Sequence, residues 1–381
     1  MKAQGGWVVA NAASSARVHH HRHHHGSSAG GSGSFSLRHA GSGSAVGAVP
    51  SLPDGVSLIE LDELQLQHRI GAGASATTYL AAWQGAHVAV KVASDTGSAK
   101  EGWRAEVAAL AQLHHPNVVR CMGAVAAPPT YCVVLEHCEG GDVRHALQRK
   151  TSPGFFWRVA EGVVSGMGYL HHRGIIHRDI KSANILLDGT SGVKLTDFGL
   201  SSRQLGDSGA AGTFRWMAPE VARREGHSKP ADMYSNAMVL YELLTHDLPF
   251  AGSSGVFAAA HAAINGARPG MPEGTPPSVA AMITRCWSSE PSERPTFEAL
   301  GKELTNVRAH LSGEELDWLD AEEGHAPPQP PPQPLAPTVS QGVALPPLQA
   351  LPPPALLARL AMEPRILPSS DSIGSEQGSS G

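Results

Sequence analysis

The segment His177–Asn184, with the sequence HRDIKSAN, constrains the fold of this chain more than any other feature. Five of its eight positions are His, Arg, Asp, Lys and Asn, and the triplet Asp197, Phe198 and Gly199 follows after a short apolar stretch. By composition alone, these five fixed residues should recur in roughly one in 10⁴ chains of this length. The pattern therefore gathers a candidate base, a candidate phosphate-binding ammonium and candidate oxygen ligands for a metal.

Composition divides the 381 residues into a central part and two tails. Residues 1–53 contain no Asp or Glu and are rich in Gly, Ala, Ser and His, whereas Pro, Gln, Leu and Ala dominate from Pro327 onward. Neither end carries enough regularly spaced apolar surface to offset the entropy of ordering it. We therefore expect disordered tails at 1–57 and 312–381, and one folded domain at 58–311.

Net charge and cysteine usage exclude several classes of protein. The formal charge of −5 at pH 7 gives no strong attraction for nucleic acid or a membrane surface, so neither partner is expected. No run of about 18 apolar residues occurs, which predicts no membrane span. The four cysteines are Cys121, Cys132, Cys138 and Cys286. They lack the paired spacing of a metal site, so we expect reduced, buried thiols in a cytoplasmic protein. The acid-poor N-terminus leaves an organellar transit peptide as an alternative to a disordered tail.

Apolar patterns predict strands first and helices later, which is an α+β arrangement. Short apolar runs at Val88–Val92 and Tyr131–Leu135 predict two strands, with one helix between them that includes Glu106. Later apolar residues recur at helical spacing in three groups: Val159–Leu170, Met238–Leu244, and Met282 with Ile283 and Trp287. We expect a small strand-rich lobe at 58–138 and a larger helical lobe at 139–311, with a cleft near Glu136–Gly140.

A glycine-rich hairpin precedes the first predicted strand. Glycine lets a backbone approach phosphates closely, where its N–H groups meet the negative charge. A strand beginning near Tyr79 follows the glycines, which excludes the dinucleotide-binding pattern because that pattern needs a helix. Lys91 follows within the strand Val88–Val92 and strengthens a nucleotide-binding interpretation. The candidate positions are Ile70, Gly71, Ala72, Gly73, Ala74, Ser75, Ala76, Thr77 and Thr78.

As a set, these motifs resemble those of eukaryotic protein kinases, and the resemblance covers Leu58 to about Leu311. The lysine at position 181, two residues after Asp179, resembles the residue that serine/threonine kinases have at this position. Several phrases resemble the tyrosine-kinase-like group, meaning Raf-like and mixed-lineage kinases of plant or algal type: Trp83-Gln84-Gly85, His115–Val119, Asp197–Ser201, Gly212–Glu220, Asp232–Ser235 and Arg285–Trp287. The resemblance implies a bilobal kinase fold, ATP and Mg²⁺, and γ-phosphoryl transfer to Ser/Thr hydroxyls of protein substrates in intracellular signalling.

The resemblance also implies a role for each residue of the catalytic core. Asp179 would accept the substrate hydroxyl proton, and Lys181 would stabilise the γ-phosphate. Lys91 would neutralise the α- and β-phosphates while Glu106 holds its ammonium. Glu101 is the alternative partner, but it lacks the apolar neighbours that Glu106 has at the following positions. The metal ligands for Mg²⁺ would be Asn184 and Asp197.

Further positions follow from the same resemblance. The hinge Glu136–Cys138 would hold adenine through its backbone, with Ala89 and Leu186 on its faces and Leu135 as gatekeeper. A packed column of an assembled active state would comprise Leu110, Cys121, His177 and Phe198. Because Cys121 is smaller than the aromatic residue often found there, we expect a looser column and lower basal activity.

Regulatory and supporting residues are expected around the segment that begins at Asp197. Arg178 suggests control through a phosphate in that segment, and Ser208 is the candidate phosphorylation site. Thr213 is expected to contact Asp179 and Lys181. Two supporting contacts are also expected: a pair between Glu220 and Arg294, and anchoring of the catalytic-loop backbone by Asp232.

The hairpin departs from the kinase pattern at Ser75, Ala76 and Thr78, where the family usually has an aromatic residue, a glycine and a valine. The smaller, more polar tip should shield phosphates less well, so we expect weakened nucleotide affinity. A catalytically weak kinase-fold scaffold that binds partners through its tails is the alternative function, and a small-molecule phosphotransferase is a third. The segment ending at Ala218-Pro219-Glu220 favours a protein substrate.

The tails carry two biased tracts. His19–His25, interrupted by Arg22, is able to bind transition metals adventitiously. The segments Pro327–Pro332 and Pro352–Pro354 favour polyproline conformation and could dock into an adaptor groove, with a solvated spacer as the alternative.

Overall fold

The computed structural model describes residues 56–72, 76–93, 99–127, 130–190, 192–198 and 213–327. The chain divides into two units, Met1–Gln329 and Pro330–Gly381, and all described residues belong to the first. Predictions on the His-rich tract, on the Pro-rich segments beyond Pro327 and on Ser208 fall outside these residues.

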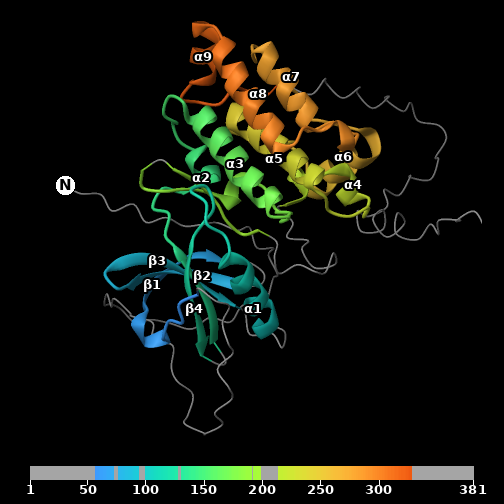
Figure 1. Cartoon of the computed structure of the whole chain (residues 1–381). Coiled ribbons are helices and arrows are strands. Elements are labelled where there is room, and N and C mark those ends of the chain that lie inside the picture. Colours follow the sequence, from blue (N-terminus) through green and yellow to red (C-terminus); the bar gives the residue numbers. More distant parts are fainter. Residues whose placement is uncertain are drawn as a thin grey trace, which may run out of the picture. The chain divides into compact units, whose positions relative to one another are not determined.

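The N-terminal part is one antiparallel sheet with a helix, as predicted (Figure 1). Its strands follow the order β1-β2-β3-β5-β4. The bounds are β1 Gln65–Ala72, β2 Ala76–Trp83, β3 Ala86–Ala93, β4 Cys121–Ala127 and β5 Thr130–Glu136, with helix α1 at Ala99–Leu110. The strands predicted from Val88–Val92 and Tyr131–Leu135 are confirmed as β3 and β5.

Alternation along β3 separates the two faces of this sheet. Val88 and Val90 are buried in a small core with Ile59 and Val134. Ala89 belongs to the large core that continues into the helical part, and Lys91 shares its side of the strand. The strand therefore directs its odd-numbered residues toward the candidate site.

Helix α1 is fixed to the sheet by an apolar stripe. Trp103, Val107 and Leu110 are buried, and Trp103 Nε1 donates a hydrogen bond to the backbone oxygen of Cys132 in β5 at 2.8 Å. The spacing of these three residues puts them on one helical face. Glu106, next to Val107, is thereby placed beside β3.

The C-terminal part is mainly helical, with a short three-stranded sheet in the order β6-β7-β8. The strands are β6 Gly141–Asp142, β7 Ile185–Leu187 and β8 Val193–Leu195. The helices are α2 Val143–Ala146, α3 Phe155–His172, α4 Pro219–Ala222, α5 Lys229–Thr245, α6 Gly255–Asn265, α7 Pro277–Cys286, α8 Phe297–His310 and α9 Gly313–Leu319. The three predicted helices are confirmed as α3, α5 and α7, although Trp287 lies just beyond the end of α7.

Two glycines of α3 let neighbouring chain segments approach the helix closely. A Cβ atom at Gly162 would lie 2.6 Å from Cβ of Val193, and one at Gly166 would lie 2.7 Å from the backbone oxygen of Asn117. That oxygen accepts a hydrogen bond from Leu195 N at 2.9 Å. Close packing on α3 therefore positions β8, whose next residues lead to Asp197.

The folded domain continues past Leu311, the end predicted from the sequence. Leu319 of α9 is buried. Asp320 Oδ1 accepts a hydrogen bond from Gly154 N at 2.7 Å, and His325 N donates to Leu244 O at 2.9 Å. The boundary at 311 is wrong for this reason: the segment after it covers the start of α3 and the end of α5.

All four cysteines are free, three of them buried and Cys121 partly so. In the part of the chain that the structure describes, no helix is both long enough and apolar enough to cross a membrane.

Candidate active site

The catalytic loop is anchored by the buried carboxylate of Asp232 from α5. It accepts hydrogen bonds from His177 N at 2.8 Å and from Arg178 N at 2.9 Å, and it pairs with His171 Nε2 at 2.8 Å. Arg178 has a φ of 70°, a left-handed conformation that is uncommon outside glycine. The predicted anchoring by Asp232 is confirmed, and it holds the backbone in this strained turn.

Asp179 is held by two neighbouring side chains. Lys181 Nζ donates to Asp179 Oδ2 at 2.7 Å, and Asn184 Nδ2 donates to the same oxygen at 2.8 Å and to the Asp179 backbone oxygen at 2.8 Å. Oδ1 of Asp179 is buried and has no hydrogen-bond partner among the described residues. One carboxylate oxygen is thus fixed, while the other keeps its acceptor capacity.

Lys181 also links the catalytic loop to the segment that follows residue 212. Its ammonium donates to Thr213 Oγ1 at 3.1 Å. The predicted contact between Thr213 and Lys181 is therefore present. Between described residues, no hydrogen bond joins Thr213 to Asp179 directly, so Lys181 connects the two.

Lys91 lies between two carboxylates. Its Nζ donates to Glu106 Oε1 at 2.8 Å and to Asp197 Oδ1 at 2.9 Å. Desolvation lowers the pKa of Lys91, but the charges of Asp197 and Glu106 outweigh it and raise the pKa above its usual value. The predicted contact between Glu106 and Lys91 is present, while the side chain of Glu101 lies outside the described part.

Asp197 is ionised and strained. Desolvation raises its pKa, but the charge and hydrogen bond of Lys91, together with the charge of Lys181, bring the pKa below its usual value. Its φ of 55° is again left-handed, and non-glycine residues in this region cluster at functional sites.

Asn184 and Asp197 have oxygens that suit a hard cation. Thr196 N donates to Asn184 O at 3.1 Å, which brings the two residues together. Asn184 uses its Nδ2 on Asp179, and its Oδ1 forms no hydrogen bond with another described residue. The Asp197 side chain is 50% exposed. This oxygen donor set fits Mg²⁺.

The predicted hinge follows β5 directly. Glu136 Oε1 accepts from Arg120 N at 2.7 Å and pairs with Lys194 Nζ at 2.9 Å, which turns this side chain toward β8. The N–H of Cys138 donates no hydrogen bond to another residue in the described ranges. Ala89 and Leu135 are buried in the adjoining core, and Leu186 packs against it.

Three of the four predicted column residues share one apolar core. Leu110 and Phe198 are buried there, and Cys121, which is partly exposed, packs against the same core. The rings of His177 and Phe198 meet edge to face with centroids 5.6 Å apart. His177 is fully buried, and desolvation lowers its pKa, so the ring is neutral at pH 7.

The glycine-rich hairpin is described on both of its strands. Ile70, Gly71 and Ala72 end β1, while Ala76, Thr77 and Thr78 begin β2, with Ala72 opposite Thr77 and Gly71 opposite Thr78. Its tip, Gly73, Ala74 and Ser75, lies outside the described residues.

Sequence reasoning identified one buried supporting pair and missed another cluster. Arg294 binds Glu220 through two hydrogen bonds of 2.6 and 2.9 Å, as predicted. Glu242 was not predicted. It is fully buried and accepts hydrogen bonds from Ser182 Oγ at 2.6 Å and from Trp216 Nε1 at 2.7 Å. These three residues come from separate segments, so no local spacing signalled their contact.

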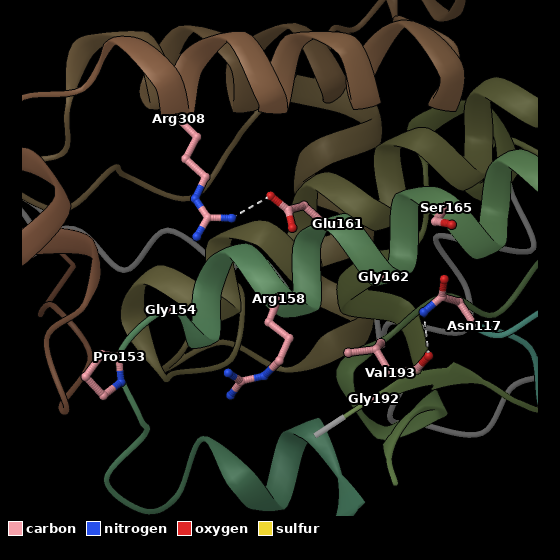
Figure 2. Close-up of a pocket in the computed structure, with 10 residues that line it drawn as sticks. All are labelled: Asn117, Pro153, Gly154, Arg158, Glu161, Gly162, Ser165, Gly192, Val193 and Arg308. Carbon is pink, nitrogen blue, oxygen red and sulfur yellow. Dashed lines mark hydrogen bonds and ion pairs between the residues drawn. The ribbon is translucent and has the colours of Figure 1, made fainter. Parts of the chain in front are cut away.

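The helical part contains a small cavity beside Asp179 and a larger one beside α3. The small one, of about 20 Å³, borders Asp179 and is also lined by Arg178, Thr213, Trp216 and His227. The larger one, of about 560 Å³, lies between α3, α8 and the β7–β8 turn, where Figure 2 shows Arg308 pointing toward Glu161. None of the predicted site residues lines the larger cavity, which is therefore separate from the candidate active site.

Comparison with known proteins agrees with this geometry. The family model for the protein kinase domain matches residues 64–304. The dual specificity protein kinase pyk3 of Dictyostelium discoideum is 37% identical over 257 residues, which cover 66% of this chain and 19% of that protein. The serine/threonine/tyrosine-protein kinase HT1 of Arabidopsis thaliana is 36% identical over 252 residues, which cover 62% of this chain and 65% of that protein.

A third relative, the serine/threonine-protein kinase CTR1 of Arabidopsis thaliana, is 37% identical over 252 residues, which cover 62% of this chain and 31% of that protein. The chain thus spans less than two thirds of the length of these relatives. Such relatives confirm the predicted tyrosine-kinase-like branch. On the family match and the bilobal arrangement, this chain belongs to the protein kinase domain family.

Proposed function

We propose that this chain is an ATP- and Mg²⁺-dependent protein kinase that phosphorylates serine and threonine hydroxyls of proteins in signalling. The observation that carries the proposal is the setting of Asp179, whose Oδ2 is fixed by Lys181 and Asn184 at 2.7 and 2.8 Å. Its Oδ1 is buried and has no partner among the described residues, so it keeps the acceptor capacity that a substrate hydroxyl would use.

In this mechanism Asp179 orients the attacking hydroxyl and accepts its proton. Lys181 keeps the carboxylate in place and offers positive charge to the oxygens of the transferring phosphoryl group. Phosphoryl transfer depends mainly on positioning and on charge stabilisation, because its charge spreads over the peripheral oxygens. The tether from Asn184 to Asp179 supplies the positioning.

Nucleotide binding would use residues of both parts of the domain. Lys91, oriented by Glu106, would neutralise phosphate charge, and the Cys138 N–H would donate to the adenine ring. Asn184 and Asp197 would hold Mg²⁺, which when bound neutralises phosphate charge. Intact geometry at all of these positions argues against the catalytically weak scaffold.

The substrate class rests on Lys181 and on the cavity beside Asp179. A hydroxyl of a protein substrate would approach the Asp179 carboxylate beside this cavity, which Arg178 and Thr213 also line. Two relatives carry names that include tyrosine or dual specificity. The preference for serine and threonine over tyrosine therefore needs a separate test.

A peptide array with Ser-, Thr- and Tyr-centred peptides tests it, using ATP and Mg²⁺ and the full chain. We expect phosphate on Ser and Thr peptides, little on Tyr peptides, and loss of signal with Asp197→Asn. Equal labelling by wild type and Asp197→Asn would contradict a role in catalysis, and labelling confined to Tyr peptides would contradict the substrate class.

A further inference from the structure

A cluster of two imidazoles and a carboxylate lies at the junction of β3 and the hinge. His87, His137 and Glu139 each offer one ligand atom, and these atoms lie within 4.8 Å of one another. The rings of His87 and His137 are edge to face with centroids 6.2 Å apart. None of the three side chains takes part in the phosphoryl-transfer mechanism.

The fold places these residues together through strand register. Gln84 and Gly85 both have positive φ, 50° and 80°, which is the conformation of a tight two-residue hairpin turn between β2 and β3. Val88 then pairs with Glu136, so one further step along the antiparallel ladder brings His87 opposite His137. Directly opposed residues share one face of a sheet and lie close together.

His137 has an unusual environment for a histidine. Its Nδ1 is buried and has no hydrogen-bond partner among the described residues. A buried polar atom without a partner costs free energy, and coordination to a cation through this nitrogen would supply the missing interaction. Neutral imidazole is the form in which a histidine binds metals.

We propose that His87, His137 and Glu139 form a binding site for a zinc-class divalent cation at the hinge. Imidazole with one carboxylate is a ligand set that suits zinc rather than magnesium. Ligand atoms around tetrahedral zinc are about 3.4 Å apart, so atoms that now lie within 4.8 Å of one another would each need to close by no more than about 1.4 Å. The side chains of His87 and Glu139 are exposed, which leaves them free to make this adjustment.

The site would tie the hinge to β3 next to Ala89. None of its three ligands is a residue of the proposed nucleotide or magnesium site, such as Lys91, Asn184 or Asp197. The zinc proposal therefore holds whether or not the proposed phosphoryl transfer occurs.

Isothermal titration of zinc chloride into the full chain tests the site, in a background where the histidines of His19–His25 are replaced by serine. We expect one zinc ion per chain and a zinc-dependent rise in melting temperature. His87→Ala and Glu139→Gln should each weaken binding at least about 10-fold. Because both residues are exposed, both variants should melt like the background without zinc.

Two controls separate this site from others. His172→Ala removes an exposed histidine on α3 and should leave zinc binding unchanged. Asp197→Asn removes a proposed magnesium ligand and should also leave it unchanged. Absence of zinc binding, equal affinity in His87→Ala and the background, or loss of binding in Asp197→Asn would overturn the proposal.

Discussion

The ammonium of Lys91 lies 2.9 Å from Oδ1 of Asp197, a residue 106 positions later in the chain. The contact joins β3 of the N-terminal sheet to the segment after β8. Glu106 completes it from α1 at 2.8 Å. Strand β3, helix α1 and the segment after β8 thus meet at the Lys91 ammonium. A polyphosphate ligand needs a cation fixed in this way.

Glu106→Gln removes the charge that holds Lys91 and keeps the side-chain shape. We expect the KM for ATP to rise and kcat/KM to fall roughly 10- to 100-fold, because the ammonium loses its orientation. Steady-state kinetics with varied ATP provide the measurement. Glu101→Gln, on the same helix, is the matched control and should behave like wild type; equal losses in both variants would refute the assignment.

Glu220→Gln should destabilise the helical part strongly. Arg294 is fully buried and would keep its charge without the carboxylate that neutralises it. Breaking a buried pair from one side costs about 3 to 5 kcal/mol. Urea unfolding measures the loss, and Glu161→Gln, which breaks the exposed pair with Arg308, should cost no more than about 1 kcal/mol. Similar losses in the two variants would be inconsistent with this account.

Glu242 should make stability depend on pH. Burial raises its pKa to about 7, although hydrogen bonds from Ser182 and Trp216 oppose the rise. Between pH 4.5 and 7 the folded chain holds a proton that the unfolded chain has released, so unfolding free energy falls as pH rises through this window. The shift corresponds to about 3 kcal/mol lost by pH 7 relative to pH 4.5.

Glu242→Gln removes this titration. The difference in unfolding free energy between wild type and the variant, measured by urea titration at several pH values, isolates the group from other titrations. We expect the variant to gain relative to wild type as pH rises from 4.5 to 7. A difference that stays constant over this range would show that Glu242 is ionised throughout.

Truncation tests the extension of the domain past Leu311. A chain ending at Leu311 loses buried Leu319 and the Asp320 contact to Gly154, and should lose about 2 kcal/mol or more. A chain ending at Pro327 keeps both and should melt like the full chain. Differential scanning calorimetry compares them, and identical melting of the two truncations would contradict the observed packing.

Motif residues could be predicted because their types and spacing are tied to chemistry. Glu106 was distinguishable from Glu101 by the apolar spacing of Val107 and Leu110, which fixes the buried face of α1. Asp232 and the pair of Glu220 with Arg294 followed from family positions. In each case a short pattern contained the information.

What could not be predicted depends on contacts between distant segments. Helix α9 has seven residues, and its large apolar residues Leu316, Trp318 and Leu319 are too few to establish a helical period. The capping box of Ser312 and Glu315 was its clearest local signal. The opposition of His87 and His137 depends on strand register, which no local pattern sets.

Turnover of Asp179→Asn tests the central claim most directly. Asn keeps the shape but cannot accept the hydroxyl proton, so kcat should fall by roughly 10² to 10⁴, while nucleotide affinity, measured by equilibrium binding, stays at the wild-type value. Asp188→Asn, in the β7–β8 turn, should retain wild-type turnover. Undiminished turnover by Asp179→Asn would contradict the assignment of this carboxylate as the base.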